Sequence, residues 1–128
     1  CWHYLIKREF LLKNGVRFIN AKVGEDQEFV ARSLCLSNCI ALYNQDFYWH
    51  RRKLGGLKSS VDLPTTLGFV ALIASLCDLL VKNDLSQDKK DFLIKRIRYA
   101  LGSMAARRIL HSMSDILEIS RAIERRNH

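Results

Sequence analysis

The stretch from Pro64 to Val81, PTTLGFVALIASLCDLLV, carries a single charge, Asp78. A helix that is apolar on nearly every side has to be buried on nearly every side, either in a protein core or in lipid. Pro64 suits the first turn of such a helix, where its missing N–H is not needed. We therefore predict a helix that begins at Pro64 and lies at the centre of the fold.

A membrane-spanning helix is the alternative for this stretch, and it needs about 20 apolar residues. The apolar run is slightly shorter, and Lys82, Asn83 and Asp84 follow it at once. A charge such as that of Asp78 is also costly inside lipid. We expect a buried core helix and no membrane span. Gly68 weakens a helix interior, so we also expect it to have a packing role.

The composition fits one basic domain. A chain of 128 residues suits a single hydrophobic core, and because it starts at Cys1 we expect residues 1–128 to be one helical domain taken from a longer chain. Lys and Arg number 21 against 13 Asp and Glu, a formal charge of +8. This excess favours an anionic partner, which can be nucleic acid, an acidic protein or an anionic membrane surface. The alternative is that the charge only keeps the domain soluble.

The four cysteines have spacings that are not typical of a metal site. Cys35 and Cys39 lie one helical turn apart in an apolar context, and Cys77 lies in the central stretch. They are typical of small buried hydrophobic residues in an intracellular, reducing compartment. A metal site built from Cys35, Cys39 and His50 would lack a fourth ligand. We therefore predict no metal and no cofactor.

The rest of the chain predicts an all-α fold, a compact bundle of about four or five helices around the central one. Apolar spacing indicates a helix from about Asp26 to Asn44, with acidic residues at its start. Before it, Asn14-Gly15 favours a helix end followed by an extended piece, Val16 to Val23. The alternative at Asn14-Gly15 is a hairpin, which would form a small N-terminal β element.

Two further helices are expected after the central one. Ser86 is a good N-cap for a helix that runs as far as Leu101, and Gly102-Ser103 then interrupts the pattern. The last helix is predicted from about Met104 to Arg125. Its apolar seam either packs internally, which we favour, or pairs two copies of the chain as a homodimer. A helix-turn-helix over Leu93–Leu117, with Gly102-Ser103 as its turn, is a further alternative.

An aromatic and basic stretch just before the central helix is the main functional signal. Residues 47–60 read FYWHRRKLGGLKSS, and no acidic residue lies between Asp46 and Asp62. Cationic side chains bind phosphates and aromatic faces stack on bases. The candidate nucleic-acid-binding residues are Tyr48, Trp49, His50, Arg51, Arg52, Lys53 and Lys58, supported by Arg96, Arg98, Arg107 and Arg108. The alternative is that the aromatic residues complete the core and the cations lie in a solvated loop.

Catalytic motifs are absent from the sequence. The four histidines, His3, His50, His111 and His128, are scattered, and no nucleophile elbow, zinc-protease motif or dinucleotide loop occurs. The sequence therefore favours a non-enzymatic nucleic-acid-binding or regulatory domain. A protein-interaction or oligomerisation module that docks an acidic or helical partner is the alternative.

Overall fold

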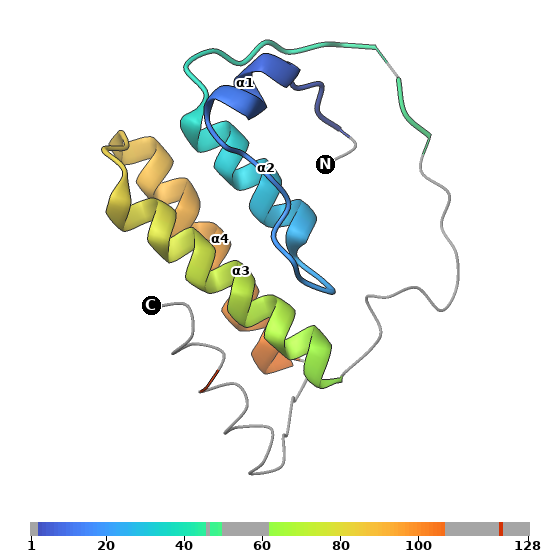
Figure 1. Cartoon of the computed structure of the whole chain (residues 1–128), viewed down its shortest axis with the longest axis vertical. Coiled ribbons are helices and arrows are strands. Elements are labelled where there is room, and N and C mark those ends of the chain that lie inside the picture. The colour runs from blue at the N-terminus through green and yellow to red at the C-terminus, as the bar shows by residue number, and fades with distance from the viewer. Residues whose placement is uncertain (1–2, 46, 50–61, 107–120, 122–128) are drawn as a thin grey trace.

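The structure is a computed structural model that describes residues 3–45, 47–49, 62–106 and 121. In these residues it has four helices and no strand, which confirms the all-α prediction (Figure 1). The helices are α1 (Arg8–Lys13), α2 (Glu25–Leu36), α3 (Leu63–Lys82) and α4 (Gln87–Ala106). Most of the predicted last helix lies outside the described residues.

The N-terminal part follows the helix alternative and forms no hairpin. Helix α1 ends at Lys13 with Asn14 as its C-cap, and Gly15 takes a positive φ of 61°, a backbone conformation that glycine adopts without steric cost. The side-chain amide of Asn14 donates to the carbonyl oxygen of Phe10 at 2.9 Å, and the Val16 amide donates to the Leu11 carbonyl at 2.9 Å. These bonds cap the helix, so the chain leaves it directly in an extended conformation.

Helix α2 starts at the acidic residues, as predicted, but it ends eight residues before the predicted end. Gly24 precedes it with φ 87°, and the last helical residue is Leu36 where Asn44 had been predicted. Ser37 is extended, and its hydroxyl donates to the Cys39 carbonyl oxygen at 2.7 Å. A serine side chain that bonds the local backbone offers the chain an alternative to the helix. The apolar spacing beyond Ser37 therefore belongs to an irregular segment.

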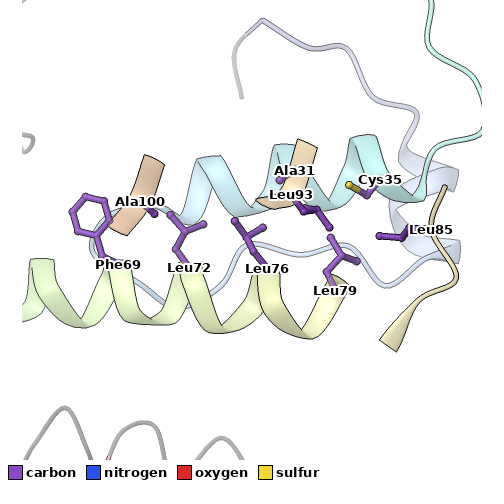
Figure 2. Packing of buried hydrophobic residues seen from close by; sticks show 9 residues of the cluster. All are labelled: Ala31, Cys35, Phe69, Leu72, Leu76, Leu79, Leu85, Leu93 and Ala100. Carbon is purple, nitrogen blue, oxygen red and sulfur yellow. The ribbon is translucent and has the colours of Figure 1, made fainter. Parts of the chain in front are cut away.

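Helix α3 is the central helix, and it begins at Leu63, one residue before the predicted Pro64. The Asp62 carboxylate caps it by accepting from the Thr65 amide at 2.9 Å, and Pro64 lies in its first turn. The core cluster brings Leu72, Leu76 and Leu79 of α3 against residues of α2 and α4 (Figure 2). Burial of these three leucines contributes roughly 1.5–3 kcal/mol each by the transfer of apolar surface from water.

Burial of α3 is less complete than its composition predicts. One face is fully buried, several apolar side chains around it are half-buried, and Cys77, Asp78 and Val81 are exposed. By length and hydropathy alone α3 would be long and apolar enough to cross a membrane, and 44% of that window is buried against the rest of the described chain. The buried face supports the interpretation of α3 as a core helix.

Helix α4 contradicts two predictions made at Gly102-Ser103. It continues without a break through both residues to Ala106, so the helix does not stop near Leu101. A helix-turn-helix with its turn at these residues is therefore wrong. One glycine costs a helix only about 1 kcal/mol relative to alanine, and the packing of Leu93 and Ala100 against α3 offsets that cost.

The three long helices do not simply alternate in direction along the chain. Gly24 lies against Gly68 and Leu72, while Glu28 bonds Ser75, so α2 and α3 run parallel. Helix α4 returns antiparallel to α3, with Leu85 near Leu79 and Ala100 near Phe69 in Figure 2. The starts of α2 and α3 therefore lie at the same end of the packed helices (Figure 1).

The loop before α2 lies so close to α3 that only glycine fits at position 68. A Cβ on Gly68 would lie 2.7 Å from the Val23 carbonyl oxygen and 2.9 Å from Val23 Cγ2. We expect Gly68→Ala to lower the free energy of unfolding by about 1–3 kcal/mol, because overpacking displaces backbone. This loss appears even though alanine favours a helix by about 1 kcal/mol over glycine. Urea denaturation followed by circular dichroism measures it.

Gly102→Ala is the matched control for this prediction. Gly102 is also helical, but a Cβ there meets no atom of the described chain within 4 Å. We expect this variant to gain about 0.5–1 kcal/mol from helix propensity alone. Equal gains in the two variants would show that Val23 does not press on α3.

Candidate functional site

The first turn of α2 holds three carboxylates, Glu25, Asp26 and Glu28. Negative side chains are favoured there by the positive end of the helix dipole and by the free amides. The three nevertheless lie in different surroundings. The differences decide which carboxylate is available for chemistry.

Glu28 is fixed in the core. Its side chain is 0% exposed, and Oε1 accepts hydrogen bonds from Arg32 Nε at 2.7 Å and from the Ser75 hydroxyl at 2.7 Å. Arg32 Nη2 lies 2.6 Å from the same oxygen and donates to Ser75 Oγ at 2.7 Å. The three side chains form a buried bridge between α2 and α3, which we call the Glu28 bridge. A carboxylate held in this way has a structural role.

Glu25 and Asp26 are half-buried and make no ion pair within the part of the chain that the structure describes. Glu25 Oε2 is buried and has no hydrogen-bond partner there. Buried polar atoms are normally paired, so an unpaired carboxylate oxygen is a candidate for an external donor. Asp26 follows it and is partly open to solvent.

A hollow of about 210 Å³ lies between the loop before α2 and the first turns of α3. It is lined by Asn20, Ala21, Lys22, Pro64, Leu67 and Gly68. The same loop continues through Gly24 into Glu25, so the hollow lies close along the chain to the two free carboxylates. The region where α2 and α3 begin therefore combines a recess with unpaired acidic groups.

Lys22 and Asp62 form an ion pair that holds the loop to the start of α3. Hydrogen bonds from Lys22 and Thr65 hold the pKa of Asp62 well below its usual range. A carboxylate with so low a pKa binds a proton poorly. Asp62 is therefore a capping group and a poor candidate for a general base.

The cysteines do not form a reactive or metal-binding centre among the described residues. No group of three or more His, Cys, Asp or Glu side chains that could hold a metal occurs there. Cys35 is buried as predicted, and burial raises the pKa of its thiol, which disfavours the nucleophilic thiolate. Cys39 and Cys77 are exposed, so the expectation that all these cysteines are buried is wrong for these two. Cys39 lies beyond the end of α2, and Cys77 is on the open side of α3.

The predicted nucleic-acid-binding residues are only partly described. Tyr48 and Trp49 are exposed, Trp49 by 89%, so the alternative in which they complete the core does not hold for them. Arg98 is exposed, whereas Arg96 is half-buried, with its guanidinium carbon 5.6 Å from the centre of the Phe92 ring. Seven candidates lie outside the described residues: His50, Arg51, Arg52, Lys53, Lys58, Arg107 and Arg108. Convergence of the basic residues on one face stays a prediction.

The Glu28 bridge and the free carboxylates were not identified as a site from the sequence. The acidic residues predicted only a helix start there. The spacing of Glu28 and Arg32 by four residues is a signal that could have been used, because such residues meet on one helix face. Ser75, the only hydroxyl in the middle of an apolar helix, is a second signal for a polar partner.

Comparison with known proteins adds one relative. The chain is 34% identical over 62 residues to the cholesterol galactosyltransferase of Borreliella burgdorferi, and the match covers 48% of this chain. It spans 17% of the length of that protein. No protein-family profile matches the chain. No solved structure matches it either.

Proposed function

We propose that this chain is part of an enzyme that transfers a sugar to a hydroxyl-bearing lipid. The observation that carries the proposal is the 34% identity over 62 residues to a galactosyltransferase. Because the match spans 17% of that protein, the donor site and the remaining machinery are assigned to sequence that the match does not include. This proposal differs from the non-enzymatic domain that the motif search favours, and the two are separated by assay.

Sugar transfer requires a base, which the free carboxylates can supply. The acceptor oxygen bonds to the anomeric carbon while the bond from that carbon to the leaving group breaks. The proton of the acceptor hydroxyl must pass to a nearby base, and carboxylates serve in this way in enzymes that act on glycosidic bonds. Glu28 and Asp62 are engaged elsewhere. We assign the base to Asp26, which is partly open to solvent and makes no ion pair among the described residues.

We expect Asp26→Asn to lower the rate of galactosyl transfer by about 10²–10⁴-fold, the usual contribution of a general base. The measurement uses the protein expressed from its complete gene, with UDP-galactose as donor and cholesterol in detergent as acceptor. Circular dichroism should show unchanged helix content, since Asp26 has no ion pair among the described residues.

Asp88→Asn is the matched control, because Asp88 also lies in the first turn of a helix, α4, and is exposed. It should transfer galactose at the wild-type rate. A wild-type protein without transferase activity would contradict the proposed function. A fully active Asp26 variant would leave the function but remove Asp26 as its base.

Nucleic-acid binding remains the second proposal, and the exposure of Tyr48 and Trp49 favours it. Base stacking on one aromatic side chain contributes about 1–3 kcal/mol, so we expect Trp49→Ala to weaken binding of a labelled single-stranded oligonucleotide about tenfold or more. Binding should also fall steeply between low and high salt. Tyr99→Ala, which removes an exposed aromatic residue of α4, should bind as the wild type does. Absence of oligonucleotide binding at low salt would exclude this function.

A further inference from the structure

The N-terminal part of the chain exposes aliphatic side chains that no described element covers. Leu5 is 78% exposed and Leu12 is 63% exposed, and Tyr4 and Phe18 are also exposed. In the segment after α2, Leu42 is 99% exposed and Ile40 lies close by in the sequence. Single exposed leucines are ordinary on a protein surface, but a group of them usually marks an interaction site.

The exposed apolar residues of the N-terminal part adjoin a packed cluster between α1 and α2. Ile6, Phe10 and Leu11 pack against Val16, Phe29 and Val30, so α1 is held on α2 by its inner side. Phe18 stacks on Phe29 with ring centroids 4.2 Å apart. The packing cluster reaches Leu36, the last residue of α2, from which the segment with Ile40 and Leu42 departs. Both exposed groups therefore start from the same end of α2, where Figure 1 shows α1.

Exposed cations lie close in the sequence to the apolar residues of the N-terminal part. Lys7, Arg8, Lys13 and Arg17 are all exposed, and Glu9 is the only acidic residue in the first 23 positions. Apolar side chains ringed by lysine and arginine are typical of surfaces that lie on anionic membranes. Nucleic acid would use the cations but gains little from exposed leucines, because stacking needs aromatic faces. A lipid interface satisfies both groups at once.

We propose that Leu5, Leu12, Ile40 and Leu42, with Lys7, Arg8, Lys13 and Arg17, form a peripheral contact surface for an anionic lipid bilayer. We call these eight residues the lipid-contact surface. The leucines enter the boundary between headgroups and acyl chains, while the cations stay at the lipid phosphates. The inference rests on the proposed function in one respect, because an enzyme that acts on a lipid has a reason to contact a membrane. The name of the relative includes cholesterol, which is a lipid.

Flotation of the protein with vesicles tests the lipid-contact surface without any sugar donor. Vesicles of phosphatidylcholine are compared with vesicles that contain phosphatidylglycerol and phosphatidylcholine at one to three, each at low and high salt. We expect binding to the anionic vesicles at low salt, and a large loss at high salt because surface charges are screened. Equal binding to both vesicle types, or no binding to either, overturns the proposal.

Charge-reversal variants locate the surface. Lys7→Glu with Arg17→Glu should weaken binding to the anionic vesicles by about 30-fold or more, from two lost cation–membrane attractions. A glutamate at position 7 is compatible with the N-terminus of α1, so the helix is retained. Lys82→Glu with Lys95→Glu makes the same change in net charge on exposed positions of α3 and α4 and should bind nearly as the wild type does. Equal losses in the two pairs would mean that only the total charge matters, and would overturn the assignment.

Leu42→Gln tests the apolar half of the surface. Its side chain is 99% exposed, so the substitution should not change the unfolding midpoint, but it should weaken vesicle binding several-fold to about tenfold because apolar burial is lost. Unchanged binding overturns the insertion of the leucines. Transfer to a water-soluble acceptor, measured on the same variants, separates a failed membrane contact from a failed transferase.

Discussion

Replacement of Arg32 by methionine is expected to lower the free energy of unfolding by about 3–5 kcal/mol, the usual cost of breaking a buried ion pair from one side. The substitution leaves the fully buried Glu28 carboxylate with only the Ser75 hydroxyl as a donor. Its second oxygen already has no hydrogen-bond partner among the described residues. Urea denaturation followed by circular dichroism measures the loss at neutral pH.

Removal of the acidic partner should cost less than removal of the basic one. The Arg32 side chain is 26% exposed, so an unpaired guanidinium can turn towards water, which the Glu28 carboxylate cannot do. We expect Glu28→Gln to lose about 1–3 kcal/mol, because an amide still accepts from Ser75. The double variant should lose less than the sum of the two single losses, since both remove the same interaction. Equal losses in the two single variants would mean that water reaches Glu28.

The start and centre of α3 could be predicted from the sequence because the signals are local. Pro64 and an apolar run are sufficient to indicate where the helix begins. The structure starts the helix at Leu63, one residue before Pro64, and its N-cap is Asp62, whose carboxylate accepts from the Thr65 amide. The packing role predicted for Gly68 is also confirmed, since Val23 lies against its backbone.

The end of α2 and the continuity of α4 could not be predicted in the same way. Apolar spacing continues past Ser37, so periodicity alone extends α2, and only the hydroxyl bond to Cys39 shows where it stops. At Gly102 the local preference favours a break, but packing along α4 overrides it. The first error comes from a local side-chain bond that apolar periodicity does not reveal, and the second from tertiary packing that outweighs local propensity.

The candidate site was predicted only as a helix start, for a physical reason. Glu25, Asp26 and Glu28 are equivalent as first-turn acids in the sequence, and Glu28 is distinguished by the Ser75 hydroxyl that α3 brings to it. Ser75 lies 47 positions away from Glu28 in the sequence, and a single sequence does not reveal such a pairing. The recess likewise joins residues 20–22 to residues 64–68 of α3, a contact between segments that are far apart in the sequence.

A second large effect is expected in α3 itself. Leu76→Ala removes a side chain that is 1% exposed and packs in the core between α2 and α4. We expect the free energy of unfolding to fall by about 2–5 kcal/mol, the sum of lost apolar transfer and the cavity left behind. Urea denaturation of the protein in aqueous buffer gives the value. The loss should lie at the high end of the range if α2 and α4 do not move inward.

Val81→Ala is the control from the same helix. Val81 is 82% exposed and lies five residues beyond Leu76, so its truncation should change stability by no more than about 0.5 kcal/mol. In a helix that crossed a membrane, lipid would surround both side chains. The two truncations would then change the free energy of unfolding by similar amounts. Similar small effects at the two positions would therefore contradict the packing of α3 as a core helix. A large difference would require that α2 and α4 cover the Leu76 side of α3 in solution.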